Sequence, residues 1–172
     1  MNFIKFKKIE IKDKNIIYKW RIKKKVKKYL LHQKITKSSH SAWFKKKIKS
    51  SKYSAWIILI NKKKIGLIQT DSIGKSKSCN AGFYIANTNY SFLSFEVICL
   101  LNNFVFNTLK FNKIESYISK DNLNIRKLNK INGYIELSKK FIYNNFIITY
   151  LTKSNWKKSK VYNYYIKRYG KL

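Results

Sequence analysis

Cysteine is rare in this chain. There are two, Cys79 and Cys99, and they do not form a CxxC pair. This spacing provides neither a zinc site nor a disulfide framework, so we expect no metal site and a reducing, cytoplasmic environment. Cys99 falls in an apolar stretch with helical spacing, which indicates a buried thiol.

Long apolar runs are also missing. Residues 1–14 hold no signal-peptide core, and no stretch approaches the roughly 20 apolar residues of a membrane span. The nearest candidate, residues 92–109, is interrupted by Ser94, Glu96 and three asparagines. We therefore expect a buried helix there and no membrane partner.

Acidic residues, arginine and proline are scarce. The chain has 39 basic and 7 acidic residues, a formal charge of +32, but only three of the basic residues are arginines and none of its residues is proline. Planar, bidentate recognition of phosphates or bases favours arginine, so dedicated nucleic-acid binding is not favoured. The excess of Lys, Asn and Ile is typical of AT-rich coding bias. The positive field still speeds encounters with anionic ligands.

The chain has enough apolar residues for one core. Its 172 residues are 45% hydrophobic and 16% aromatic, as in a folded domain. No repeat or low-complexity linker divides it. We therefore expect a single domain.

Hydrophobic periodicity predicts the order of the elements. The expected strands are residues 3–11, 53–60, 65–73, 79–86, 113–119, 134–137 and 141–152. The expected helices are residues 14–31 with a break near the KKK run, 40–49, a stretch ending near 109, and 123–132. Residues 53–86 indicate an antiparallel meander, and the strand–helix–strand–helix order after it favours a parallel crossover. The basic aromatic tail from residue 154 is compatible with helix.

Three residues are expected to cap helices. Asp13 precedes the first helix, and Ser38 or Ser39 precedes the second. Gly133 stands where a left-handed residue would end the last helix before the closing hairpin.

Several stretches together resemble one enzyme superfamily. The opening is carried by Trp20-Arg21, Ile35-Thr36, His40 and Trp43-Phe44, and the later landmarks are Lys64-Ile65-Gly66, Ala81-Gly82-Phe83-Tyr84-Ile85, Phe104-Val105-Phe106, Lys113-Ile114-Glu115, Asn122 and Asn132-Gly133-Tyr134. In this order they are similar to the GNAT acetyltransferases. The opening resembles the branch that acetylates UDP-linked 4-amino sugars on the way to pseudaminic acid.

The resemblance implies an α/β (α+β) fold. It implies a GNAT domain over residues 1–153, with a mixed, mostly antiparallel twisted sheet of about seven strands and helices on both faces. Residues 154–172 would form a tail packed on the same domain. The implied protein is a monomer or homodimer.

The implied reaction is direct acetyl transfer from acetyl-CoA to a primary amine, with no covalent acyl-enzyme. In this resemblance, the strands at residues 79–86 and 113–119 part to admit the pantetheine arm, and the next helix start binds the pyrophosphate. The cofactor-binding residues implied are Ile85, Ala86, Phe92, Leu93, Ser94, Phe95, Glu96, Asn122 and Asn129. The substrate-binding residues implied are Arg21, His40, Gln69 and Tyr84, for a nucleotide-linked amino sugar.

The sequence departs from the superfamily at two places. The pyrophosphate loop normally carries Q/R-x-x-G-x-G/A, but residues 89–96 contain no glycine, and Phe92 and Phe95 narrow the backbone geometries there. The tyrosine that often protonates the leaving thiolate is replaced by Asn129. Our hypothesis is therefore that Tyr84 and Tyr117 face the reacting centre, with Glu115 or water relaying the proton and Asn129 as a hydrogen-bond donor.

Other functions compete with this one. A GNAT enzyme could instead acetylate a protein N-terminus of the ribosomal-protein type. The charge, the missing glycines and Asn129 also fit a non-catalytic, lysine-rich RNA-binding protein or an eroded enzyme. Binding of acetyl-CoA separates the enzyme from the RNA-binding protein.

Overall fold

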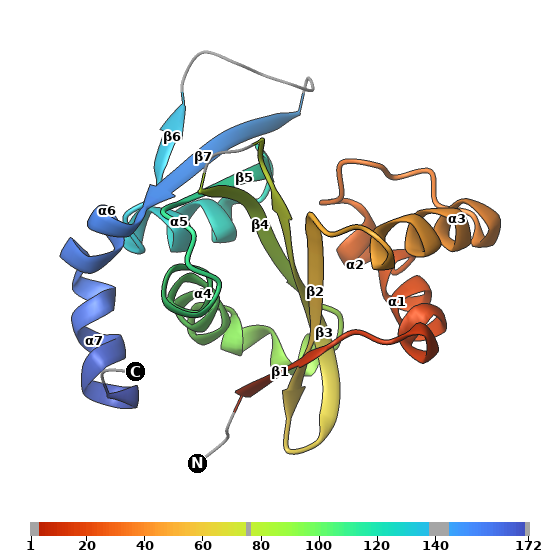
Figure 1. Cartoon of the computed structure of the whole chain (residues 1–172), viewed down its shortest axis with the longest axis horizontal. Helices are drawn as coiled ribbons and strands as arrows, with labels where there is room; N and C mark the ends of the chain where they lie inside the picture. Colours follow the sequence, from red (N-terminus) through yellow and green to blue (C-terminus); the bar gives the residue numbers. More distant parts are fainter. Residues whose placement is uncertain (1–3, 75–76, 138–144, 171–172) are drawn as a thin grey trace. The chain divides into compact units, whose positions relative to one another are not determined.

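The structure of the chain is a computed structural model that describes residues 4–74, 77–137 and 145–170 (Figure 1). Its strands form one seven-stranded sheet in the order β1-β2-β3-β4-β5-β7-β6. The pair β4–β5 is parallel, and the pairs β1–β2, β2–β3, β5–β7 and β6–β7 are antiparallel. The expected mixed α/β sheet is confirmed. Residues 3 and 141–144, which belong to two expected strands, lie outside the described residues.

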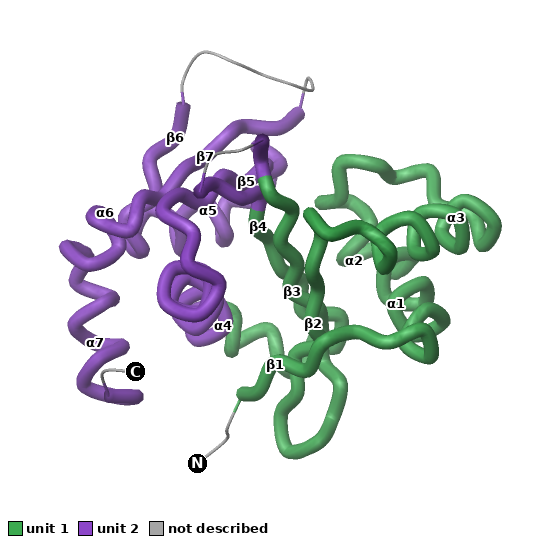
Figure 2. The backbone as a smooth tube through the Cα atoms, viewed as in Figure 1, with its two compact units in different colours: residues 1–72, 81–94 green, residues 73–80, 95–172 purple. Residues whose placement is uncertain are grey.

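The chain forms two compact units, coloured separately in Figure 2. The first contains Met1–Ser72 and Ala81–Ser94, and the second contains Ile73–Asn80 and Phe95–Leu172. Strand β4 (Ser78–Ile85) passes from the second unit to the first after Asn80. Its parallel pairing sets Ser78 opposite Lys113, Cys79 opposite Ile114 and Asn80 opposite Glu115, so Asn80 is the last registered residue of that pairing.

The first unit begins with an antiparallel meander. It consists of β1 (Ile4–Lys8), β2 (Tyr53–Ile60) and β3 (Lys63–Ser72). The apolar run of β2 is buried continuously from Ala55 to Ile58, as expected for a strand that is covered on both faces. The hairpin turns at Asn61 and Lys62, both with positive φ, a geometry that matches the right-handed twist of the two strands.

Three helices lie on one side of β2 and β3 (Figure 1). They are α1 (Lys14–Arg21), α2 (Lys24–Lys27) and α3 (Lys37–Ile48), preceded by the 3-10 helix Ile11–Asp13. The expected break near the KKK run is therefore confirmed. Ile17, Trp20, Val26 and Phe44 anchor these helices in one apolar cluster with β2 and β3. Each such side chain contributes about 1.5–3 kcal/mol when fully buried.

Two expected caps are wrong in detail. Asp13 occupies the N-cap position of α1 but makes no cap bond there; its carboxylate accepts from the Glu10 N–H at 3.0 Å and pairs with Lys64 Nζ at 2.6 Å. The N-cap of α3 is Thr36, whose hydroxyl accepts from the Ser39 N–H at 3.1 Å. The Ser39 hydroxyl in turn accepts from the Thr36 N–H at 3.0 Å, so Ser39 closes a reciprocal capping box rather than standing at the cap.

The second unit contains the parallel crossover. After a 3-10 helix (η2, Thr88–Leu93) come α4 (Ser94–Asn103), a π-helical turn (η3, Phe104–Thr108), β5 (Lys113–Ser119), α5 (Leu123–Ile131), β6 (Ile135–Leu137) and β7 (Phe146–Thr152). Gly133 follows α5 with φ +86°, which confirms the expected left-handed helix end.

Helix α4 is a core helix of the second unit. The continuous helical stretch Thr88–Thr108 is long and apolar enough to cross a membrane by length and composition alone, but half of its most apolar 18-residue window is buried. Asn102, fully buried, donates to Asn132 Oδ1 at 3.2 Å and accepts from the Tyr134 hydroxyl at 2.8 Å. Buried polar groups bonded in this way hold α4 to the connection between α5 and β6.

The tail of the chain forms α6 (Lys153–Lys158) and α7 (Lys160–Tyr169). Thr152 and Ser159 cap them, accepting from Asn155 N–H and Tyr162 N–H at 3.1 Å each. Trp156 and Tyr165 are each 1% exposed, so the tail has an apolar face that is buried. Lys153 Nζ also donates to the Phe106 carbonyl at 3.2 Å.

Candidate active site

Arg21 ends α1 and is held by His40 of α3. The Nη1 atom of Arg21 lies 3.2 Å from His40 Nδ1, and His40 Nε2 lies 3.0 Å from the Lys14 carbonyl oxygen. A carbonyl only accepts, so Nε2 carries the proton and Nδ1 accepts from Arg21. Burial lowers the pKa of His40, outweighing the bond to Lys14 that raises it, and the Arg21 charge lowers it further. His40 is therefore a neutral acceptor that orients the guanidinium.

The Arg21 charge lacks a counter-ion within the described part of the chain. Its Cζ lies 4.0 Å from the Trp43 ring centroid, a cation–π contact. None of the carboxylates among residues 4–74, 77–137 and 145–170 forms an ion pair with it. Burial lowers the pKa of Arg21, which means that desolvation disfavours its charged form.

Gln69 is connected to this group through Tyr53. The Tyr53 hydroxyl donates to Gln69 Oε1 at 3.1 Å, and the Tyr53 ring lies 6.1 Å from the Trp43 ring. We call Arg21, His40, Trp43, Tyr53 and Gln69 the Arg21 cluster. It brings together three of the four residues expected to bind substrate. Sequence reasoning missed Tyr53, whereas Trp43, which belongs to the resemblance, lies beside His40 with 5.4 Å between the ring centroids.

Tyr84, on β4, has a buried hydroxyl that makes no hydrogen bond to any described residue. Its ring lies 6.4 Å from the Trp20 ring, in an edge-on contact. Burial raises the pKa of Tyr84 strongly, although the nearby Arg21 charge opposes the rise. The hydroxyl therefore stays protonated at neutral pH and is an O–H donor without a partner, which costs about 1–3 kcal/mol.

Gly66 of β3 fixes the backbone at Tyr84. A Cβ added at Gly66 would overlap the Tyr84 carbonyl oxygen and lie 3.0 Å from Ile85 Cα, so only glycine allows this close approach. We expect Gly66→Ala to lower the free energy of unfolding by about 1–3 kcal/mol, since the β4 backbone must shift. Denaturant unfolding measures this change.

Gly82 of β4 is the matched control. A Cβ added there meets nothing within 4 Å. We expect Gly82→Ala to change stability by no more than about 0.5 kcal/mol. Equal losses in the two variants would contradict a close approach specific to Gly66.

Several backbone N–H and carbonyl groups from the end of β4 to the start of α4 form hydrogen bonds within the chain. Ala86 N–H and Asn87 N–H both donate to the Ile65 carbonyl, at 2.7 and 3.1 Å, and the Ala86 carbonyl accepts from Lys23 Nζ at 3.1 Å. The Ser94 N–H donates to the Ser91 carbonyl. The glycine-free stretch is thus a 3-10 helix that runs into α4, and Ala86 and Ser94 offer fewer free donors than the resemblance implies.

The two aromatic residues of this stretch, Phe92 and Phe95, differ in their surroundings. Phe92 is 73% exposed, whereas Leu93 is 6% exposed. In the second unit, the Phe95 ring lies 5.7 Å from the Tyr164 ring of α7. Glu96 is bound by Arg168, with Nε at 3.0 Å, and by the Tyr169 hydroxyl. The side chains of Phe95 and Glu96 therefore attach α7 to α4, and only their backbone could serve a cofactor.

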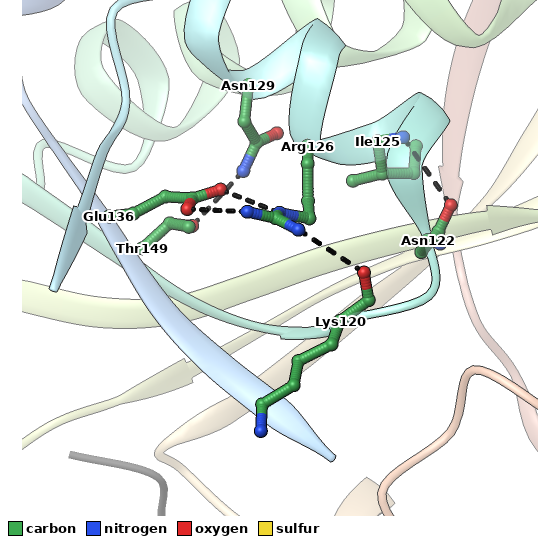
Figure 3. A network of polar contacts seen from close by, with 7 residues as sticks. All are labelled: Lys120, Asn122, Ile125, Arg126, Asn129, Glu136 and Thr149. Atoms are coloured by element: carbon green, nitrogen blue, oxygen red, sulfur yellow. Dashed lines mark hydrogen bonds and ion pairs between the residues drawn. The ribbon is translucent and has the colours of Figure 1, made fainter. Parts of the chain in front are cut away.

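The two expected asparagines of α5 have structural partners (Figure 3). Asn122 caps the helix, with its Oδ1 3.4 Å from the Ile125 nitrogen. Asn129 is 4% exposed and donates from Nδ2 to Thr149 Oγ1 at 3.1 Å. One of the two N–H donors of the Asn129 amide is thus used by β7, and its buried position leaves the expected donation to a leaving thiolate a prediction.

The remaining expected residues lie on β5. Glu115 pairs with Lys113 Nζ at 2.8 Å, and Tyr117, half-buried, stands opposite Ile148 of β7. Asn80, opposite Glu115 in the parallel register, has a buried Nδ2 with no partner among the described residues. Asn80 in the second unit and Tyr84 in the first unit each carry a buried donor on β4 without an acceptor among the described residues. No sequence pattern indicated Asn80.

The two cysteines are buried. Cys79 is fully buried and Cys99 is 1% exposed, which confirms the expected buried thiol at Cys99. Burial raises the pKa of each thiol to about 12, so neither forms a thiolate near neutral pH.

A family model described as the acetyltransferase (GNAT) domain matches residues 4–135. The chain belongs to the GNAT acetyltransferase family. Its expected family, fold and enzyme class are thereby confirmed. A comparison with curated protein sequences found no significant match.

Several solved structures share the fold of this chain. Spermidine N-acetyltransferase from Vibrio cholerae, in complex with CoA and spermine, has a TM-score of 0.77 at 16% identity, over 89% of this chain and 97% of that one. The N-acetyltransferase PseH of Campylobacter jejuni, in complex with acetyl coenzyme A, has a TM-score of 0.66 at 22% identity, over 88% and 99%. A domain from Methanocaldococcus jannaschii has a TM-score of 0.75 at 18% identity, over 88% and 99%.

Proposed function

We propose that this GNAT chain transfers the acetyl group of acetyl-CoA directly to the primary amine of an acceptor that also carries negative charge. The acceptor we favour is the 4-amino group of a UDP-linked amino sugar. The observation that carries the proposal is the half-buried Arg21, which has no counter-ion among the described residues, is oriented by His40 and is stacked on Trp43.

An anion on the acceptor would complete the Arg21 cluster. A guanidinium has five N–H donors in a planar fork, and His40 takes only one of them. The remaining donors match the oxygens of a phosphate or carboxylate. The similarity of Trp20-Arg21 and His40-x-x-Trp43 to the UDP-4-amino-sugar acetyltransferases supports the nucleotide sugar as the source of that anion.

A polyamine acceptor is the main alternative, because one similar structure is a spermidine acetyltransferase. The charge of this chain argues against it. A cationic chain near Arg21 would meet a like charge rather than a carboxylate, and like charges at close range cost free energy in a partly buried site. An anionic acceptor gains from the same charge.

We assign the proton donor to Tyr84. In the proposed step the acceptor nitrogen forms a bond to the thioester carbonyl carbon, the C–S bond breaks, the amine loses a proton and the CoA sulfur gains one. The buried Tyr84 hydroxyl, which has no acceptor among the described residues, donates its proton to the departing sulfur and takes a replacement proton from solvent. For Asn129, which donates one N–H to Thr149, we keep only the role of an additional hydrogen-bond donor. The protonated thiols of Cys79 and Cys99 agree with direct transfer.

The amine needs little help to lose its proton. The net positive charge of the chain disfavours an ammonium and lowers its pKa, which increases the share of neutral, nucleophilic amine. We propose Tyr117 and Glu115 on β5, or a water molecule, as the relay that takes the proton. Glu115 already forms an ion pair with Lys113, so it must share its carboxylate with that lysine.

Acetyl-CoA has suitable partners on β4. The buried donors Asn80 Nδ2 and Tyr84 OH lack acceptors among the described residues, and carbonyl or thioester oxygens would satisfy them. We propose that the Tyr84 hydroxyl, with the backbone of Ile85, binds the pantetheine arm.

The test is acetyl transfer to three acceptors with purified protein: a UDP-linked 4-amino sugar, spermidine and a peptide N-terminus. Release of free CoA thiol measures the rate. We expect kcat/KM for the nucleotide sugar to exceed that for spermidine by at least about tenfold, the value of one discriminating contact. Preference for spermidine would reject the anionic acceptor. Nanomolar RNA binding without acetyl-CoA binding would reject the transferase itself.

A further inference from the structure

The first unit contains a pocket of about 310 Å³ where α2 meets the end of β4. Three consecutive lysines supply its charge, and no carboxylate lines it. The lining residues are Lys23, Lys24, Lys25, Val26, Ile85, Ala86, Asn87 and Thr88. We call this the lysine pocket.

The segment that carries the pocket lysines has a higher fraction of basic residues than the chain as a whole. Seven of the ten residues 19–28 are Lys or Arg, compared with 39 of 172 overall, so a composition that is rich in lysine everywhere does not explain them. In the described part of the chain these seven form no ion pair. Like charges four residues apart, such as Lys23 and Lys27, destabilise a helix unless an anion offsets them.

The pocket is held in place on both of its sides. Val26 is 5% exposed and anchors α2 in the apolar cluster of the first unit. Lys23 Nζ donates to the Ala86 carbonyl at 3.1 Å, which fixes one ammonium at the end of β4. An ammonium has three N–H donors, so Lys23 keeps two for a ligand.

The backbone beside the pocket offers few donors of its own. The N–H groups of Ala86 and Asn87 bond to Ile65, and that of Ser94 bonds to Ser91. Residues 89–96 contain no glycine that would open the backbone to an anion. An anion at this end of β4 must therefore be neutralised by side chains.

We propose that the lysine pocket binds the phosphoryl groups of a diphosphate. The lysines of α2 would then replace the glycine-rich backbone that this chain lacks. The proposal deepens the proposed function and rests on it for the source of the ligand, because CoA and a UDP-linked acceptor both carry a diphosphate. The binding chemistry itself is the same for either source.

The test compares two triple variants with equal loss of charge. The pocket variant removes the three lysine charges that line the pocket, through Lys23→Gln, Lys24→Gln and Lys25→Gln. The control combines Lys157→Gln, Lys158→Gln and Lys160→Gln, all exposed and in the second unit. Inorganic pyrophosphate, CoA and UDP are titrated calorimetrically into each variant and into the unchanged chain. We expect the pocket variant to weaken pyrophosphate binding at least about tenfold, and the control to weaken it by about twofold or less, through the general field alone.

The other two probes identify the source. A matching loss for CoA alone assigns the pocket to the cosubstrate, and a loss for UDP alone assigns it to the acceptor. Pyrophosphate affinity that falls equally in both triple variants overturns the proposal. Lys24→Glu, a single change at an exposed residue, repeats the test by charge reversal if the triple variant does not fold.

Failure of the pocket and failure of the proposed function differ in this experiment. If the pocket variant acetylates the acceptor with unchanged kinetics, the proposed function stands and the proposed role of the lysine pocket is rejected. If the unchanged chain binds pyrophosphate through these lysines but releases no CoA thiol, the lysine pocket stands as a binding site and the proposed function is rejected.

Discussion

Arg21→Ala is expected to lower kcat/KM for an anionic acceptor about 30- to 100-fold. The loss corresponds to one charge-assisted hydrogen bond of roughly 1.5–3 kcal/mol. It should appear mainly in KM, because a contact to a charged group remote from the reacting amine is made equally in ground and transition states. Stability should change little, since removal of an unpaired, half-buried charge also removes its desolvation cost.

The controls separate geometry from charge. Arg21→Lys keeps the charge but loses the planar fork and the stacking on Trp43, so we expect an intermediate loss. Lys19→Gln removes one exposed charge two residues earlier on α1, and we expect less than about a twofold change from the weaker field.

The sign of the effect with spermidine decides between acceptor classes. If the acceptor is cationic, Arg21→Ala removes a repulsion and raises kcat/KM. If the acceptor is anionic, the same variant lowers it. If Arg21→Ala raises kcat/KM for spermidine above kcat/KM for the nucleotide sugar, that result would contradict the role we give Arg21.

The order of the elements could be predicted because each is marked locally. Residues 53–60 form an uninterrupted β-rich run before a polar turn, and β2 has these same bounds. The KKK run crowds like charges within one helical turn, and α1 and α2 separate there. Local hydrophobic periodicity and charge decide such boundaries, so they are visible in the sequence.

The caps were harder, because several hydroxyl residues compete over a few positions. Thr36, Ser38 and Ser39 all qualify by type. The reciprocal bonds between Thr36 and Ser39 decide in favour of Thr36, and these bonds depend on backbone angles that the sequence does not display.

The site was predicted where its residues share a motif and missed where long-range packing matters. Arg21 and His40 belong to the resemblance, and the structure joins them. The role of Asn129 was inferred from the resemblance alone. Its hydrogen bond to Thr149, 20 residues later on β7, depends on tertiary packing. The unsatisfied donors of Asn80 and Tyr84 are tertiary properties, since burial without a partner leaves no sequence signal.

Tyr84→Phe is expected to lower kcat about 10²- to 10⁴-fold, the usual contribution of a placed proton donor. The same variant should unfold at an equal or slightly higher temperature, because the hydroxyl that it removes is buried and has no partner among the described residues. Loss of rate with retained stability is the signature of a hydroxyl kept for a ligand. Steady-state kinetics and thermal unfolding on one preparation measure both.

Tyr134→Phe provides the opposite signature. Its hydroxyl donates to the fully buried Asn102, so its removal leaves that acceptor unsatisfied and should cost about 1–3 kcal/mol of stability. Near-normal kcat is expected at a temperature where the variant is folded. If Tyr84→Phe instead loses stability as Tyr134→Phe does and keeps its rate, the Tyr84 hydroxyl is structural, and proton donation to the thiolate must come from elsewhere.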